Sequence, residues 1–504
     1  MDIIEERSLV SREFLAVILC GFGNELHPLT SNNGDEPCPK ALLPVANKPI
    51  IDYTLAWVEQ ARIQDVLVIC PTTHRTAISH HIDSDISSSS TVLRIDVQTF
   101  DESQDASIGT STVLRHFASR IQGDFILLPC DFIPPPSLPL SVLLDKFRTE
   151  ALADGAIATT CWFATPKKHE KDKSLTPDEW GPAVAPTAIV WDDASGTLLH
   201  VDTPDAIDDN ADDMELRMAL LDRYPHTKLS SGFTDSHVYI CKRTVLDALV
   251  DKPLFESFRE DLLPWLCKIQ YQRTKHRKYG QLLHPKTSVI TQDLSLSHST
   301  LRINSTQNAD DTEDSEEVQD TPASLRVGVV LFRPSGPEEH VARINNIHSF
   351  FETNRHCLTT ASWTLPSEPK ARSLIDAKAQ ISTDSIIGTS TQIAERASIK
   401  RSTIGKHCVI GKMAKITGCV LLDHCVVEDG AKLEGSILGK NTKVGAKADV
   451  SKCVTQAGYE VPAGETVKNE KLDVSDWTAV SEEGDDEDDE DEDEDASESS
   501  DDST

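Results

Sequence analysis

The sequence predicts a protein with two folded parts, an α/β domain and then a parallel β-solenoid, followed by an acidic tail. Three observations lead to this prediction. A short apolar run, Phe14 to Cys20, is followed at once by a glycine loop. From Ile387 onward, aliphatic residues recur in steps of six, six and five. The stretch Glu482 to Asp502 contains sixteen acidic residues and no basic residue.

The length and charge of the chain restrict the classes of protein to which it can belong. With 504 residues, the chain is long enough for two or three domains with a substantial core. Its formal net charge is −33, of which the acidic tail supplies about half. The rest is moderately acidic and has no basic block, which argues against direct nucleic-acid binding as the main role.

Cysteine usage and hydropathy indicate the cellular compartment in which the protein acts. The twelve cysteines include no Cys-x-x-Cys pair, so the sequence indicates neither a zinc module nor a disulfide framework, and a reducing compartment is the simplest interpretation. The amino terminus lacks the layout of a signal peptide, and no apolar run reaches the length of a membrane span. We therefore expect a cytosolic protein that does not act at a membrane.

The start of the chain predicts a βαβ unit. The run Phe14 to Cys20 suits a buried parallel strand, because it is short and ends at Gly21 and Gly23. Open α/β sheets bind ligands at this end of a strand, and glycine lets backbone amides approach a phosphate. Apolar residues from Ile50 to Val58 then predict a helix, and 66–70 predicts the second strand.

Further strands are expected along the α/β domain, and one of them ends in a carboxylate. A helix is expected to begin after Gly109, and Asp131 follows an apolar strand. A carboxylate at the carboxyl end of a strand can hold Mg²⁺ against phosphates. An aspartate that caps a turn is the commoner case, so both interpretations stay open. The other expected strands cover 92–97, 159–163, 188–191, 198–201, 236–241 and 327–332, with a hairpin around Gly196.

Polar segments set the expected domain boundaries. Residues 304–320 have almost no large apolar side chains and are expected to form a disordered insert. The α/β domain is predicted to span 12–365, and a hydrophilic linker is predicted over 366–383. The acidic tail, 478–504, is expected to stay unfolded because its charges repel one another.

The aliphatic repeat predicts one coil every seventeen residues, from Ile387 to Ile404, Leu421 and Leu438. A helix would turn a side chain six residues on to a different face, whereas a three-sided solenoid points one aliphatic inward per face. Tight corners are expected to need the small residues Gly388, Gly405, Gly411, Gly439 and Gly445.

This repeat resembles the hexapeptide repeats of the left-handed parallel β-helix, which we expect over residues 384–470. Some acyltransferases with this repeat use a histidine between subunits. His407 and His424 lack an evident donor-binding context, and we expect them to be surface histidines.

The α/β domain resembles the Rossmann-like nucleotidyltransferase domain of the sugar-nucleotide pyrophosphorylases. The match lies in Gly21 to Thr30, in Pro39 to Ile50, and in the segments around Gly109 and Asp131. In that family the glycine loop and an arginine wrap the nucleoside triphosphate, and the motif lysine helps to neutralise its charge. The resemblance implies that Asp131 corresponds to the first magnesium ligand. The candidates for a vestigial nucleotide pocket are Gly21, Gly23, Lys40, Gly109 and Asp131.

Two departures from that family predict that the domain is not catalytic. The Thr-Arg pair of the glycine loop is replaced by Asn24 and Glu25, and a carboxylate repels a triphosphate that a guanidinium would bind. The Trp-x-Asp-x-Gly-Thr segment, which carries the family's second metal ligand, is not found. Because two-metal phosphoryl chemistry needs both ions, we expect no catalytic residue, no metal site and no required cofactor. Residual nucleotide binding stays open because Lys40 and Asp131 persist.

Over roughly residues 12–470 the chain resembles the gamma subunits of eukaryotic translation initiation factor 2B, a guanine nucleotide exchange factor. The resemblance rests on Asp235 to Ile240, Asp261 to Leu266, Arg343 to Asn346 and Glu352 to Arg355. It implies a non-catalytic subunit that pairs with epsilon and joins alpha, beta and delta. That assembly exchanges GDP for GTP on initiation factor 2 to allow delivery of initiator tRNA. The alternative is a sugar-1-phosphate guanylyltransferase or its inactive regulatory paralogue.

Overall fold

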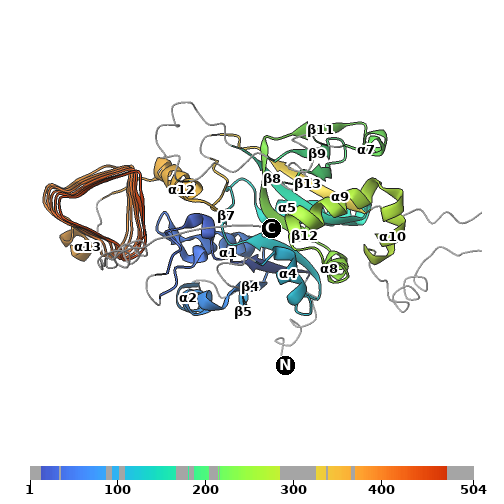
Figure 1. The fold of residues 1–504 in the computed structure, drawn as a ribbon, viewed down its shortest axis with the longest axis horizontal. Coiled ribbons are helices and arrows are strands. Elements are labelled where there is room, and N and C mark those ends of the chain that lie inside the picture. The colour runs from blue at the N-terminus through green and yellow to red at the C-terminus, as the bar shows by residue number, and fades with distance from the viewer. Residues whose placement is uncertain are drawn as a thin grey trace, which may run out of the picture.

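The computed structural model shows an α/β domain with a triangular β-prism beside it (Figure 1). It describes residues 13–32, 36–86, 93–101, 108–165, 180, 187–203, 214, 216–283, 325–336, 339–364 and 369–473. The expected insert at 304–320 and the expected acidic tail lie outside these residues. Across the described ranges, no helix has the length and apolar character needed to cross a membrane.

A ten-stranded mixed sheet forms the centre of the α/β domain, in the order β11-β9-β10-β13-β8-β12-β6-β1-β4-β5. β1 pairs in parallel with β4 and β6, so the carboxyl ends of these strands meet at one edge. The hairpin expected around Gly196 is the antiparallel pair β9 and β10. The strands are β1 (Phe14–Leu19), β4 (Asp65–Pro71), β5 (Arg94–Phe100), β6 (Asp124–Pro129), β8 (Ala156–Ala164), β9 (Ile189–Asp192), β10 (Thr197–Val201), β11 (Thr227–Ser230), β12 (Phe233–Cys241) and β13 (Arg326–Phe332).

Helices cover the sheet. The burial of β1 on both faces explains why its sequence is apolar throughout. Val17 belongs to the core on one face of the sheet, whereas Ala16 and Ile18 belong to the core on the other. A strand buried on both faces needs a continuous apolar run rather than an alternating one. The helices are α1 (Ile50–Gln60), α2 (Arg75–His81), α4 (Thr110–His116), α5 (Leu140–Ala153), α7 (Met218–Arg223), α8 (Arg243–Val250), α9 (Leu263–Tyr271), α10 (Arg273–Leu283), α12 (Ile347–Thr360) and α13 (Pro369–Ser373).

Short elements connect the sheet to the rest of the domain. The glycine loop ends in the 3-10 turn η2 (Asn24–Leu26), and η3 (Lys40–Leu42) precedes the small hairpin of β2 (Pro44–Val45) and β3 (Lys48–Pro49). β7 (Phe132–Ile133) is separated from β6 by Cys130 and Asp131, and it pairs with β14 (Ala342–Arg343). This pairing brings residues 342–346 beside the carboxyl end of β6.

The prism is a parallel β-helix of three sheets. Ile387 pairs with Ile404, Ile404 with Leu421 and Leu421 with Leu438, which confirms the period of seventeen. Its strands are β15 (Gln380–Ile381), β16 (Ile386–Ile387), β17 (Gln392–Ile393), β18 (Ser398–Lys400), β19 (Thr403–Ile404), β20 (Val409–Ile410), β21 (Lys415–Thr417), β22 (Val420–Leu421), β23 (Val426–Val427), β24 (Lys432–Glu434), β25 (Ile437–Leu438), β26 (Lys443–Val444), β27 (Asp449–Ser451), β28 (Val454–Thr455), β29 (Glu460–Val461), β30 (Thr466–Lys468) and β31 (Lys471–Leu472).

Three details bear on the expectations for the β-helix. β15 pairs with β18, so the first strand of the prism lies within the range 366–383 that the sequence assigned to a linker. At Gly405 an added Cβ would lie 2.6 Å from Asp423 Oδ1 of the next coil. The requirement for glycine there comes from the close approach of neighbouring coils. His407 and His424 are exposed, and their rings stack with centroids 5.0 Å apart.

The β-helix packs on the α/β domain through one of its three faces, and α12 lies between the two parts (Figure 1). We call this contact the β-helix seat. Asn47 Nδ2 donates to the carbonyl oxygen of Ile404 over 2.8 Å, and Gln456 Nε2 donates to that of Asn32 over 2.8 Å. Its apolar members are Leu26, Leu29, Leu43, Val45, Ile50, Ile133, Trp180, Ile344, Ile347, Phe350 and Phe351 from the α/β side, with Val420, Leu422, Ile437 and Val454 from the β-helix.

Candidate functional site

A cavity of about 390 Å³ lies at the carboxyl ends of β1, β4 and β6. This is the place where open α/β sheets bind ligands. One part of its wall is apolar and includes Leu19, Ile69, Phe100, Val113, Leu127 and Phe258. The opposite end is polar and is formed by Lys40, Asp131, His237, Arg343 and Asn345.

The glycine loop borders the polar end and lies directly on the lysine stem. Gly23 has a φ of +82°, and a Cβ there would lie 2.9 Å from Lys40 Cβ. A side chain at this position would therefore be strained and would also displace Lys40. Asn24 and Glu25 follow in η2, where both line the cavity and are exposed.

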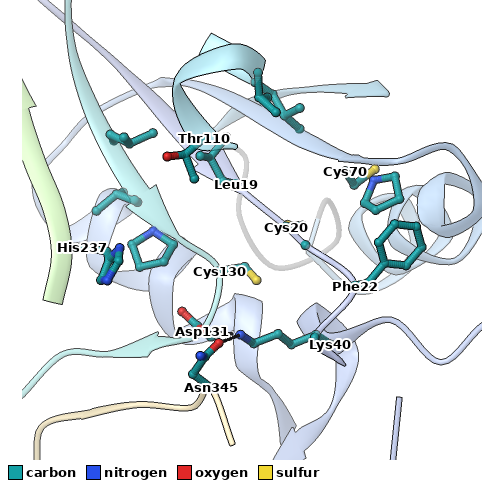
Figure 2. A pocket seen from close by; sticks show the side chains of 18 of the residues that line it. Leu19, Cys20, Phe22, Lys40, Cys70, Thr110, Cys130, Asp131, His237 and Asn345 are labelled. Atoms are coloured by element: carbon teal, nitrogen blue, oxygen red, sulfur yellow. Dashed lines mark hydrogen bonds and ion pairs between the residues drawn. The ribbon is translucent and has the colours of Figure 1, made fainter. Parts of the chain in front are cut away.

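Four residues at the polar end form a charged cluster, which Figure 2 shows in part. Lys40 Nζ is paired with Asp131 Oδ2 and also donates to Asn345 Oδ1 over 2.8 Å. On the other side, Arg343 Nε lies 3.3 Å from Asp131 Oδ1. Each carboxylate oxygen of Asp131 thus faces a cation from the protein itself. We refer to Lys40, Asp131, Arg343 and Asn345 as the charged cluster.

Burial makes this cluster electrostatically strong. Only 1% of Asp131 and 5% of Lys40 is exposed, so water screens their attraction weakly. Burial alone would raise the pKa of Asp131, but the Lys40 ammonium and the Arg343 guanidinium outweigh it and hold that pKa below its ordinary value. Asp131 is therefore ionised at neutral pH.

A bulge in β12 shapes the neighbouring wall. The register between β12 and β8 shifts between Asp235 and Tyr239, and His237 within the bulge has a φ of +56° and lines the cavity. Burial, together with the charge of Arg343, holds the pKa of His237 well below its ordinary value, so the ring is neutral at neutral pH. Asp235 is held in the bulge by Tyr239 Oη, which donates to its carboxylate, and by Arg259, whose Nε lies 3.4 Å away.

The structure brings four of the five predicted pocket residues to one cavity. Gly21, Gly23, Lys40 and Asp131 line it, and their binding of a nucleotide stays a prediction. Gly109 is not among the lining residues, although its neighbours in the chain are. A Cβ there would lie 2.2 Å from the carbonyl oxygen of Glu256, so Gly109 serves close packing.

Sequence reasoning did not place His237, Arg343 or Asn345 at this site. Arg343 is 212 residues from Asp131, and Asn345 is 305 residues from Lys40. Spacing carries no signal over such distances. The segment from Arg343 to Asn346 supports the family resemblance, but the resemblance did not indicate that it lines the cavity.

The cavity combines an apolar wall with a polar end that contains few carboxylates. Among the described residues that line the cavity, the carboxylates are Glu25 and Asp131. Within the parts of the chain that the structure describes, no three His, Cys, Asp or Glu side chains are grouped to hold a metal ion. The apolar wall can accept a small organic group, whereas the cations at the polar end are shared with Asp131.

These features define the class of protein, a nucleotidyltransferase-like domain joined to a left-handed β-helix. Two family models match the chain accordingly. The nucleotidyl transferase model covers residues 15–170. The model described as the EIF2B subunit epsilon LbH domain covers residues 370–467.

Similarity to curated proteins identifies the family within this class. The eIF2B gamma subunit of Schizosaccharomyces pombe is 30% identical over 462 residues, covering 91% of this chain and 90% of that protein. The gamma subunit of Dictyostelium discoideum is 25% identical over 422 residues, covering 79% and 89%. The epsilon subunit of the same organism is 24% identical over 259 residues, covering 51% of this chain and 33% of that protein. The chain belongs to the eIF2B gamma subunit family and is a subunit of translation initiation factor 2B. This family fits the chain better than the guanylyltransferase alternative.

Proposed function

We propose that this chain is a non-catalytic subunit of the exchange factor and acts in the cytosol. It pairs with the epsilon subunit, joins alpha, beta and delta, and supports the exchange of GDP for GTP on initiation factor 2. Its nucleotidyltransferase-like domain serves as a framework and requires no cofactor.

The main support for the loss of catalysis is that Asp131 is engaged in the charged cluster. A magnesium-dependent transferase needs this carboxylate for the metal ion. Here Lys40 and Arg343 hold both of its oxygens. Replacing Lys40 by a metal would leave a buried ammonium without its partner, and breaking a buried ion pair costs about 3–5 kcal/mol.

Glu25 adds a second obstacle to triphosphate binding. It is exposed beside the glycine loop, where it repels an incoming polyphosphate. The neutral His237 supplies no compensating positive charge.

The pairing with epsilon is supported by a face of the β-helix that the seat does not use. The sheet containing β20 and β23 points Val409 outward, and Val409 is 40% exposed. Met413, at the adjoining corner, is 58% exposed. Exposed aliphatic side chains on a flat parallel sheet are suited to packing against another β-helix.

Purification of the tagged chain from its own cells tests the proposal, with mass spectrometry of the recovered proteins and an assay of GDP release from initiation factor 2. We expect the other four subunits to be recovered, release activity in the complex, and none in the isolated chain. Magnesium-dependent formation of a nucleotide sugar by the isolated chain, or recovery of a guanylyltransferase in place of these subunits, would contradict the proposal.

A further inference from the structure

We propose that the charged cluster is a latch that couples the cavity to the β-helix seat. Lys40 and Asn345 are then positioning residues for the β-helix. The inference rests on the proposed loss of catalysis, because a working transferase would need Asp131 for its metal.

One connection between the cavity and the seat runs along the chain from Lys40. Within seven residues, η3 and the β2–β3 hairpin lead from the cavity to Asn47, which donates to the β-helix at Ile404. Leu43 and Val45, between these ends, belong to the apolar cluster of the seat. A movement of Lys40 is thus transmitted to the seat through a short, packed segment.

The second connection runs from Arg343 into α12. The backbone N–H of Ile344 donates to the carbonyl oxygen of Asp131 over 2.9 Å, and Ile344 also belongs to the seat. Asn346 caps α12 by accepting from the N–H of Ser349 over 2.7 Å. Phe350, one turn further along α12, belongs to the apolar cluster of the seat together with Val420 and Ile437.

These two connections are joined to each other at both ends. At the cavity, Lys40 bridges Asp131 and Asn345. Near the β-helix, the N–H of Ala46 donates to Asn354 Oδ1 over 3.0 Å. The resulting closed loop of contacts holds α12 and the β2–β3 hairpin together, and the β-helix packs on both. Asp131 anchors this loop to the central sheet, because only Cys130 separates it from the end of β6.

The coupling follows from the shared use of Lys40. Any anion that enters the polar end competes with Asp131 for Lys40 and Arg343. Withdrawing Lys40 also breaks its hydrogen bond to Asn345, which loosens the start of α12. Occupancy of the cavity and the position of the β-helix are then linked, because both depend on Lys40.

Hydrogen exchange on the full chain, followed by mass spectrometry, tests the latch with two variants. Lys40→Met removes the ammonium but keeps an unbranched stem that can pack on Gly23. Asn345→Ala removes the side-chain amide whose oxygen accepts from Lys40. We expect both variants to exchange at least tenfold faster in residues 44–49, in α12 and in β22. β5 and β30, which are remote from the seat, are expected to be unchanged. Lys228→Met, which breaks an exposed ion pair with Asp193, is the matched control and is expected to have no effect.

Two further measurements separate a latch from general destabilisation. Asn345→Asp retains an acceptor for Lys40, so its exchange is expected to be slower than that of Asn345→Ala. Asn345→Leu lacks an acceptor and is not expected to slow exchange. The double variant Lys40→Met/Asn345→Ala is expected to exchange no faster than Lys40→Met alone, because Asn345 acts through Lys40.

Faster exchange confined to residues 20–25 and 237–239, with α12 unchanged, would overturn the proposal, as would independent effects in the double variant. If Lys40→Met does not fold, the three single variants at Asn345 test the latch without it. The outcomes for the latch and for the proposed function are distinct. If the chain forms no nucleotide sugar but the variants leave exchange in α12 unchanged, only the latch is refuted. If the chain forms a nucleotide sugar and the variants still speed exchange in α12, only the loss of catalysis is refuted.

Discussion

Replacing Asp131 by asparagine measures how strongly the charged cluster stabilises the α/β domain. The side chains of Asp131 and Lys40 are 2% and 6% exposed, so this variant leaves a buried ammonium without a negative partner. Breaking a buried pair in this way costs about 3–5 kcal/mol. We expect about 3 kcal/mol, because asparagine still offers Lys40 an acceptor and the quarter-exposed Arg343 can turn to water. This is a large part of the ~5–15 kcal/mol that stabilises a typical domain.

Native-state hydrogen exchange of the amides in β1 and β6 is the suitable assay, because a chain with two domains does not unfold in one step. The slowest amides there report the free energy of unfolding of the α/β domain. Asp193→Asn is the matched control: its carboxylate pairs with Lys228 at the surface, and we expect no measurable change.

The variant Lys40→Met/Asp131→Asn completes a double-mutant cycle. We expect it to lose less stability than the sum of the two single variants, since it no longer buries an unpaired charge. A loss below ~1 kcal/mol for Asp131→Asn, or strictly additive losses in the cycle, would refute the reasoning, because the buried pair would then not be energetically coupled.

Three further predictions concern other parts of the molecule. Leu433→Ala, inside the β-helix at 2% exposure, is expected to cost about 2–5 kcal/mol and to make the coils sensitive to limited proteolysis; unchanged resistance would contradict its place in the core. Glu25→Arg restores a cation at the glycine loop but leaves Asp131 engaged, so a magnesium-dependent assay is expected to detect no nucleotide sugar; a detected product would show that Glu25 alone had disabled the domain. Burial lowers the pKa of His74 to about 4, and burial with the nearby His356 does the same for His340. Because the fold keeps these rings neutral while the unfolded chain takes up protons below pH 6.5, stability is full above pH 6.5 and falls towards pH 4. By pH 5.5 the loss of stability is about 1 kcal/mol for each ring. Unfolding midpoints of the wild type and of His340→Gln at pH 7.5 and 5.5 measure it. Equal pH dependence in both proteins would contradict the lowered pKa of His340.

The sequence by itself determined the parts of the fold that depend on local patterns. The seventeen-residue period is visible because each coil of a β-helix contacts only its neighbours, so the structural repeat is also a sequence repeat. The apolar run before Gly21 identified β1, since a short apolar run that ends at glycines suits a strand buried on both faces. Lys40 and Asp131 were identified as pocket residues because each lies in a short motif.

The tertiary structure decided which groups Lys40 and Asp131 contact. Lys40 meets Asn345 across 305 positions of the chain, because β14 pairs with β7 and places residues 342–346 beside the end of β6. The bulge that turns His237 into the cavity depends on the register of β12 against β8. Neither event leaves a local pattern, since both arise from pairing between strands that are distant in sequence. The sequence therefore specified the two parts of the protein, whereas long-range pairing assembled the charged cluster beside the β-helix seat.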